Sequence, residues 1–307
     1  MTNIAAAIDI GTNSTKMTVA RIDGGAPVVL FDRSEVTRLG KGVDESKKLA
    51  DDAIARTLDA VARFAGEARA AGASTIVTAG TSALRDASNG AEVIRQAKER
   101  AGVDIQIVDG DREAELAYLA VAKDPAVASL GTGLKLLVFD IGGGSTELII
   151  GGVDGIERHQ SLNIGAVRLT ERFIKSDPPS EGELAKVEGF ARGTFEGFGR
   201  PEGRVVVAGI GGTAVNIAAV LAGSRDAEIH GVTVSRADVE KAYARFRGMP
   251  LAERRVIPGL EPERADVIVA GAAILDQLLS FLDAAEFRVS TRGLRFGLLV
   301  EYAQSGR

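Results

Sequence analysis

One short motif occurs twice in this sequence, and the repeat constrains the fold more than any other feature. Asp-Ile-Gly-x-x-Ser-Thr occupies residues 9–15 and again residues 140–146. Each copy follows an apolar run and continues into alternating apolar residues, which predicts a strand, a tight turn and a second strand. The backbone N–H groups and hydroxyls of such a turn converge on one point and suit a phosphate. Two copies therefore predict two similar lobes that face each other over a phosphate chain.

Composition narrows the class of protein and excludes several functions. The 307 residues can form two domains, and no apolar run reaches the roughly 18 residues of a membrane helix. The chain has no cysteine, and His159 and His230 lie far apart, which argues against thiolate, zinc and histidine-triad chemistry. A net charge of −5 argues against a broad nucleic-acid surface. Without a basic N-terminal signal, we expect a cytoplasmic protein with no membrane or nucleic-acid partner.

Strands alternate with helices in both halves, the pattern of an α/β fold. Strands are expected at residues 4–10, 16–22, 27–36, 75–79, 105–108, 134–140, 146–151, 156–162 and 204–208. Helices are expected at 51–71, 91–101, 112–122, 166–175, 180–198, from the loop at 209–213 to about 221, 235–246, 263–282 and 295–304. Segments 123–125 and 131–133 look like a boundary. We therefore expect an N-terminal lobe of residues 1–123, a C-terminal lobe of 124–293, and a closing helix at about 294–307 that packs back on the first lobe.

Four small polar loops each follow a predicted buried strand, at residues 11–15, 80–86, 142–146 and 209–213. Open α/β sheets bind ligands at the carboxyl ends of their strands, so four such loops favour a shared phosphate site. The last loop also begins a helix, whose N–H groups and dipole attract an anion. The first loop contributes Thr12, Asn13 and Ser14 as phosphate-binding candidates, and in the second Arg85 could grip phosphate oxygens with its guanidinium.

Acidic residues beside these loops are candidates for holding a cation and for activating water. Asp9 and Asp140 end the strands before the two repeated turns, where each could hold a hydrated divalent cation. Glu147 follows the second turn at the position where the first copy has Lys16, which would make the two lobes chemically different. Glu113 lies in the first turn of a predicted helix, where an acidic residue also has the ordinary role of stabilising the helix start.

Together these segments resemble the exopolyphosphatase/guanosine pentaphosphatase (Ppx/GppA) family over almost the whole chain. The likeness rests on the turn at 9–14, Gly-Thr-Ser-Ala-Leu-Arg-Asp-Ala at 80–87, Asp-Ile-Gly-Gly-Gly-Ser-Thr-Glu at 140–147 and Gly-Ile-Gly-Gly-Thr at 209–213. The wider superfamily of actin, sugar kinases and Hsp70 chaperones shares the duplicated turn but not the loop at 80–85 joined to the run at 140–147. The resemblance implies two ribonuclease-H-like lobes with a cleft between them. The chain lacks the His-Asp pair of longer members and resembles their short, two-domain form.

The resemblance also implies roles for individual residues. The family's catalytic base is the second glutamate of Ser-Gly-x-Glu-Glu-Ala, which here reads Asp-Gly-Asp-Arg-Glu-Ala at 109–114. Glu113 aligns with that base, while Asp109 and Arg112 depart from the pattern. Asp140 and Glu147 match residues that hold Mg²⁺ and help to position water, with Asp9 as a further metal candidate. The implied phosphate-binding residues are Arg85, Gly143, Gly144, Ser145, Gly211, Gly212 and Thr213.

The expected function is therefore Mg²⁺-dependent, processive hydrolysis of inorganic polyphosphate, which releases orthophosphate one unit at a time. Guanosine pentaphosphate is an alternative substrate, because no segment of the sequence identifies or excludes a nucleoside pocket. A kinase or ATPase of the superfamily is a further alternative, since the glycines at 211–212 could bind adenosine. A non-catalytic polyphosphate or nucleotide sensor is the last, suggested by the changes at Asp109 and Arg112. The closing helix offers an edge for a homodimer.

Overall fold

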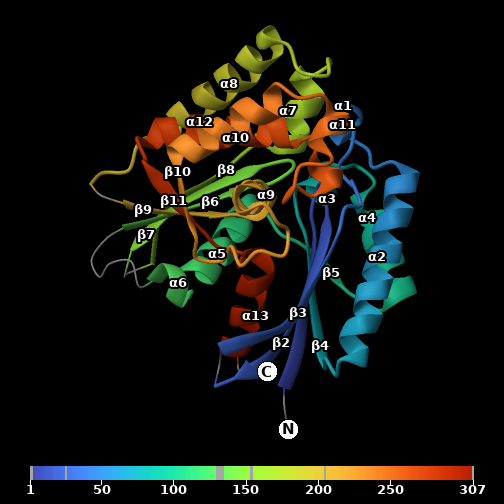
Figure 1. Ribbon diagram of the computed structural model, residues 1–307. Coiled ribbons are helices and arrows are strands. Elements are labelled where there is room, and N and C mark those ends of the chain that lie inside the picture. The colour runs from blue at the N-terminus through green and yellow to red at the C-terminus, as the bar shows by residue number, and fades with distance from the viewer. Residues whose placement is uncertain (1–2, 25, 129–134, 153–154, 204, 306–307) are drawn as a thin grey trace. The chain divides into compact units, whose positions relative to one another are not determined.

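Both copies of the repeated motif form the turn of a β-hairpin in the computed structural model, which describes residues 3–24, 26–128, 135–152, 155–203 and 205–305 (Figure 1). The chain divides into one unit of Met1–Ala120 with Arg292–Arg307 and a second of Val121–Thr291. The expected boundary at 123–125 lies a few residues past this division, whereas that at 131–133 lies outside the described residues. Each unit is a sheet with helices packed on it, which confirms the α/β class.

The sheet of the first unit has the strand order β3-β2-β1-β4-β5. Its strands are β1 (Asn3–Ile10), β2 (Thr15–Asp23), β3 (Ala26–Glu35), β4 (Thr75–Gly80) and β5 (Ile105–Ile107). The first three pair antiparallel, and β4 and β5 add in parallel on the other side of β1. The helices of this unit are α1 (Val43–Ser46), α2 (Asp51–Ala70), α3 (Ser82–Asp86), α4 (Gly90–Ala101), α5 (Gly110–Ala122) and α13 (Leu294–Gln304).

Side chains along β1 alternate between two apolar layers, as a central strand requires. Ile8 and Ile10 pack in the layer that includes residues of α2 and α4. Ala5 and Ala7 face the opposite layer, which α5 and α13 complete. Alanines on that face let these two helices lie close to the sheet, and α13 contacts β1, β2 and β3. The last helix of the chain therefore covers the first strand.

The sheet of the second unit has the order β10-β11-β9-β6-β7-β8. Its strands are β6 (Lys135–Ile141), β7 (Thr146–Gly152), β8 (Gly155–Leu162), β9 (Val205–Ile210), β10 (Thr233–Ser235) and β11 (Glu286–Val289). Its helices are α6 (Pro125–Ala128), α7 (Ala166–Phe173), α8 (Glu181–Glu196), α9 (Gly211–Ala222), α10 (Arg236–Arg247), α11 (Leu251–Arg254), α12 (Ile268–Leu282) and the 3-10 turn η1 (Pro262–Arg264). The apolar α12 packs against α7, α8, α9 and α10. None of the described helices is both long and apolar enough to cross a membrane.

The two sheets repeat one topology and one register. An antiparallel β-meander is followed in each unit by two parallel strands, β4 and β5 in the first and β9 and β11 in the second. Asp9 pairs with Lys16 across the first hairpin, and Asp140 pairs with Glu147 across the second. The turn hydrogen bond is also the same, from Gly11 N–H to Ser14 O at 3.1 Å and from Gly142 N–H to Ser145 O at 3.0 Å. The predicted duplication is confirmed.

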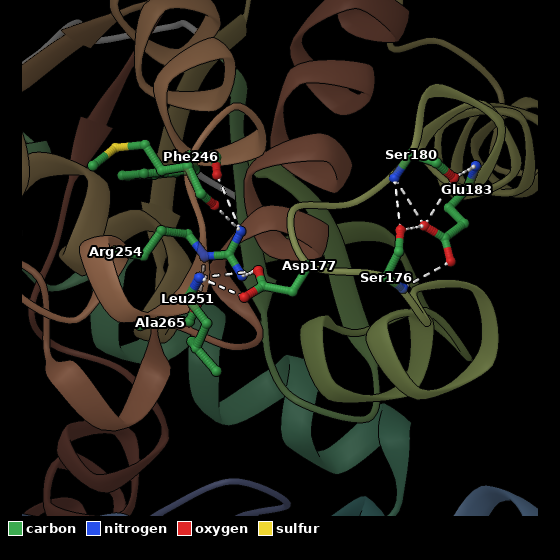
Figure 2. A network of polar contacts seen from close by, with 9 residues as sticks. Ser176, Asp177, Ser180, Glu183, Phe246, Leu251, Arg254 and Ala265 are labelled. Atoms are coloured by element: carbon green, nitrogen blue, oxygen red, sulfur yellow. Dashed lines mark hydrogen bonds and ion pairs between the residues drawn. The ribbon is translucent and has the colours of Figure 1, made fainter.

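The prediction of one helix over residues 263–282 was wrong, and a buried arginine gives the reason. The chain forms η1 and starts α12 only at Ile268. Figure 2 shows the Arg254 guanidinium, which donates to the carbonyl oxygens of Ala265 at 3.0 Å, Met249 at 2.8 Å and Phe246 at 3.2 Å, and to Asp177 at 3.0 Å. The Ala265 carbonyl thus accepts from a side chain at the point where a continuous helix would use it. The short elements α1, α3, α6, α11, β10 and β11 were not predicted either.

Close contact between α5 and α13 fixes the helix that carries Glu113. A Cβ atom on Gly297 would clash with the carbonyl oxygen of Leu116, so the two helix backbones touch where only glycine fits. Leu116 also packs with Leu298 and Leu299 of α13. The second turn of α5, which directly follows Glu113, is therefore held against α13.

We expect Gly297→Ala to lower the free energy of unfolding by roughly 1–3 kcal/mol, the usual cost of overpacking a tight contact. Gly66→Ala is the matched control, because Gly66 is an exposed residue of α2 with open space around its missing side chain. That variant should gain up to about 1 kcal/mol from better helix propensity. Urea unfolding followed by circular dichroism measures both. Equal effects of the two substitutions would contradict this account of the α5–α13 contact.

Candidate active site

The predicted site residues fall into two sets, one in each unit. In the first unit, parallel register places Ile10 beside Gly80 and Gly80 beside Ile107, so β1, β4 and β5 end at one edge of the sheet. The turn at 11–14, helix α3 and the start of α5 follow these three ends. In the second unit, Asp140 pairs with Ile210, so the turn at 142–145 and the start of α9 likewise leave neighbouring strand ends. Register alone therefore gathers each set.

The turn at 11–14 is held from several sides. The Thr12 and Ser82 hydroxyls lie 2.8 Å apart and are buried, and the Thr81 N–H donates to Ile10 O at 3.2 Å. Asn13 and Ser14 are buried as well. The amide nitrogen Nδ2 of Asn13 has no hydrogen-bond partner within the described residues. The Thr12 hydroxyl thus stabilises the turn, and the Asn13 amide is a donor that a phosphate could use.

Arg85 and Glu113 lie together at this edge. The Nη1 atom of Arg85 donates to Val108 O at 2.9 Å and lies 3.7 Å from Glu113 Oε2. The Glu113 side chain is only 12% exposed. An arginine at this distance stabilises a carboxylate, the form in which a glutamate can accept a proton from water. The structure thus places the predicted phosphate-binding arginine beside the predicted base.

The two departures from the family pattern both have partners in the first unit. Asp109 Oδ1 accepts the Arg112 N–H at 2.8 Å, which caps the start of α5 as a serine would. The Arg112 guanidinium binds Glu115 at 2.9 Å and Glu301 of α13. Aspartate in place of serine at position 109 thus keeps the helix cap. Arginine in place of glutamate at position 112 ties α5 to α13.

Asp9 is a half-buried residue with a buried Oδ1 atom and a cationic neighbour. Burial raises the pKa of Asp9, and the charges of Lys16 and Arg295 partly offset that rise. Its Oδ1 atom has no hydrogen-bond partner within the described part of the chain. The equivalent residue in the second unit, Asp140, faces Glu147 instead of a lysine. The repeat therefore has one backbone geometry and two different charge patterns.

Asp140 and Glu147 are the acidic residues among the predicted site residues of the second unit. Glu147 is buried, and its Oε1 atom accepts a hydrogen bond from the Ser161 hydroxyl at 2.8 Å. Gly211 begins α9 with a φ of +84°, and a Cβ atom there would clash with Asp140 Oδ1. The Asp140 carboxylate thus lies against the N-terminus of α9, where only glycine fits.

The remaining phosphate candidates of this unit lie at the start of α9 and in the turn at 142–145, whose carbonyl groups are already bonded. Gly143 O accepts from two N–H groups at the start of α7, and Gly144 O accepts from Arg168 Nε at 2.7 Å. Ser145 is buried, and the Thr213 hydroxyl donates to Ile141 O at 3.3 Å. Gly212 lies so close to the Arg264 guanidinium that a Cβ there would clash with it. The turn is thus shaped before any ligand binds.

The carboxylates of the second unit fit a magnesium ion. Within the described ranges, no group of three or more histidine, cysteine, aspartate or glutamate side chains could hold a metal. Asp140 and Glu147 nevertheless offer two carboxylates at facing positions of a hairpin. Mg²⁺ is usually held by one or two carboxylates and completes its shell with water and substrate phosphate. Asp9 belongs to the other unit and has Lys16 opposite it, so it fits a metal less well.

Sequence reasoning missed several residues that shape the two sets. Ser161 pairs with Glu147 in the β7–β8 register, so a closer reading of that hairpin could have found it. Ser82 was part of a predicted loop, but its bond to Thr12 spans 70 residues. Arg264 reaches Gly212 from η1, and no sequence signal pointed to that contact.

Comparison with known proteins agrees with this geometry. The model of the Ppx/GppA phosphatase family matches residues 18–305. Exopolyphosphatase 2 of Mycobacterium tuberculosis is 33% identical over 293 residues, 89% of this chain and 89% of that protein. A bifunctional 3-dehydroquinate synthase/phosphatase of Fusobacterium nucleatum is 29% identical over 97% of this chain, which spans only 46% of that relative. The solved structure of the Aquifex aeolicus Ppx/GppA family member is 30% identical with a TM-score of 0.82, and the match covers 100% of this chain and 99% of that one. The chain belongs to the Ppx/GppA phosphatase family.

Proposed function

We propose that this protein is an exopolyphosphatase, which hydrolyses the terminal phosphoanhydride bond of inorganic polyphosphate and removes one orthophosphate after another. Family membership and the name of the mycobacterial relative support the proposal. The observation that carries it is the Asp140–Glu147 pair at the start of α9. This arrangement offers carboxylates for a cation and N–H groups for phosphate oxygens at the same place.

The proposed reaction uses Glu113 as a general base. A water molecule attacks the terminal phosphorus, its proton passes to the Glu113 carboxylate, and the bridging P–O bond breaks. The shortened polyphosphate leaves with the electron pair of that bond, in line with the attack. Arg85 lies 3.7 Å from Glu113, so its guanidinium can bind an oxygen of the terminal phosphate close to the base. The first unit thus supplies the base and the arginine of the proposed reaction.

In the second unit, the proposed residues bind the cation and the negatively charged phosphate oxygens. Asp140 and Glu147 would hold Mg²⁺, which when bound supplies positive charge against the phosphate oxygens. The Ser161 hydroxyl holds Glu147 in place for this role. Gly143, Gly144 and Ser145 form the turn, and Gly212 and Thr213 the helix start, that would donate N–H groups to the phosphate. Asp9 as a further metal ligand stays a prediction.

The structure bears differently on the three other hypotheses for the function. Guanosine pentaphosphate presents the same terminal phosphoanhydride bond, so it is the second candidate substrate. A kinase or ATPase would use the start of α9 for a nucleotide, and only an assay separates that reading. The sensor hypothesis depended on Asp109 and Arg112. Because Asp109 still caps α5 and Arg112 turns to Glu115 and Glu301, neither change removes Glu113 from the first turn, and this favours an enzyme.

Orthophosphate release from polyphosphate, guanosine pentaphosphate and ATP, each with Mg²⁺ and with EDTA, tests this function. We expect Mg²⁺-dependent release from polyphosphate, with long chains and orthophosphate present together and few intermediates. Glu113→Gln should lower kcat by about 10²–10⁴-fold, the usual contribution of a general base. Glu115→Gln is the matched control, since Glu115 is an exposed residue of the same helix, and it should retain activity.

Normal hydrolysis by Glu113→Gln would exclude Glu113 as the base. Turnover of a nucleotide without release from polyphosphate would move the function to that nucleotide.

Asp9→Asn should make the protein more stable and less active. The pKa of Asp9 is higher in the folded protein than its ordinary value of 3.8, so the folded state binds this proton more tightly than the unfolded state. The ionised Asp9 carboxylate therefore destabilises the folded protein at neutral pH, and this destabilisation decreases as the pH falls. We expect Asp9→Asn to raise the free energy of unfolding by about 1 kcal/mol at pH 7.5. This is the lower end of the cost of burying a polar group without a hydrogen bond. Thermal unfolding of the variant and the wild type at pH 7.5 and pH 5 should show a smaller gain in stability at pH 5. A less stable and fully active variant would contradict this reading of Asp9.

A further inference from the structure

A buried carboxylate lies where the chain leaves the first unit. Asp124 follows the end of α5 and is fully buried. Its Oδ2 atom accepts a hydrogen bond from the Ser290 hydroxyl at 3.1 Å and lies 3.2 Å from His230 Nε2. Its Oδ1 atom accepts the Ala126 N–H at 3.1 Å. Ser290 is also fully buried and stands just before Arg292, where the chain returns to the first unit. Both crossings of the chain thus meet in one polar cluster of Asp124, His230 and Ser290.

The hydrogen bonds of His230 determine which ring nitrogen carries the proton. The Thr291 N–H donates to Nδ1 at 3.3 Å, so Nδ1 is an acceptor and Nε2 carries the hydrogen in the neutral ring. That hydrogen points to Asp124, which therefore receives donors from His230, Ser290 and Ala126. A buried carboxylate with several donors is held firmly, and the loss of one donor leaves an oxygen that water cannot reach.

Two elements connect this cluster to the candidate active site. Helix α5 carries Glu113 in its first turn and ends at Ala122, about 14 Å away at the usual rise of a helix. Asp124 holds the chain two residues beyond that end. On the other side, the Ser290 N–H donates to Gly209 O at 2.9 Å, on the strand that leads into Gly211 and α9. The cluster thus joins the end of the helix that bears the candidate base to the strand that leads to a candidate phosphate loop.

We propose that Asp124, His230 and Ser290 are positioning residues for the hydrolysis, because they join the end of α5 to β9 and so fix the helix that presents Glu113. This proposal rests on the proposed function. None of the three touches the substrate, and none takes part in proton transfer. Their loss would free the end of α5 from β9 and so misplace Glu113. A network that served stability alone would affect unfolding and leave the rate of the intact enzyme unchanged.

The test uses the full chain with His230→Gln and Ser290→Ala. His159→Gln is the matched control, because His159 is the other histidine of the sequence and lies on β8. Val239→Ala removes buried apolar volume from α10 and serves as a destabilised control. For the cluster variants we expect kcat on polyphosphate to fall by about 10- to 100-fold, the scale of a small misplacement of a catalytic group. KM should stay within about twofold, because these residues do not contact substrate. Hydrogen exchange of the amides at the end of α5 should be faster in these variants only.

Two results would overturn the proposal. One is an unchanged kcat together with unchanged hydrogen exchange at the end of α5 in both cluster variants. The other is a fall in kcat that merely follows the fall in melting temperature, as Val239→Ala would define it. Wild-type protein that releases no orthophosphate from polyphosphate refutes the proposed function instead. In that case hydrogen exchange alone decides on the cluster, and unchanged exchange at the end of α5 in both cluster variants refutes its positioning role.

Discussion

Backbone pairing between the hairpin strand of each motif and its parallel neighbours is the constraint on which the site depends. Hydrogen bonds between β1, β4 and β5, and between β6, β9 and β11, align the strand ends at one edge of each sheet. Loops that are distant in sequence then leave from adjacent points. No side chain is needed to gather them, so the loops can vary in chemistry while the frame stays the same. This explains how one frame can serve two lobes with different charges.

The two lobes differ in charge at one position of the hairpin register. Lys16 faces Asp9 in the first hairpin, and Glu147 faces Asp140 in the second. A lysine neutralises its carboxylate partner, whereas a second carboxylate adds negative charge beside the first. Duplication followed by this change would separate the two roles that hydrolysis of a polyanion requires. In the proposed reaction, one lobe presents the base with an arginine, and the other presents the carboxylates for a metal.

Most of the fold could be predicted because its signals are local. Strand alternation, the repeated turn and the amphipathic helices are periodic patterns, and each predicted strand matches an observed strand within a residue or two. What could not be predicted depends on partners distant in sequence. The break before α12 requires Arg254 to reach the Ala265 carbonyl, and the contact between Arg264 and Gly212 depends on the fold of η1. Of the candidate site, register grouped the predicted residues within each unit. The cluster around Asp124 joins residues from opposite ends of the second unit and leaves no mark in any short window of sequence.

The position of α13 has a consequence for how the protein is made. The first unit consists of Met1–Ala120 and Arg292–Arg307, so its last helix leaves the ribosome after the whole second unit. Until then, Ala5 and Ala7 of β1 have no α13 to cover them, and Gly297 cannot yet meet Leu116. During synthesis the second unit can close around α12 while the first is still incomplete. The helix that presents Glu113 is therefore fixed last, although it is translated well before the segments that hold it.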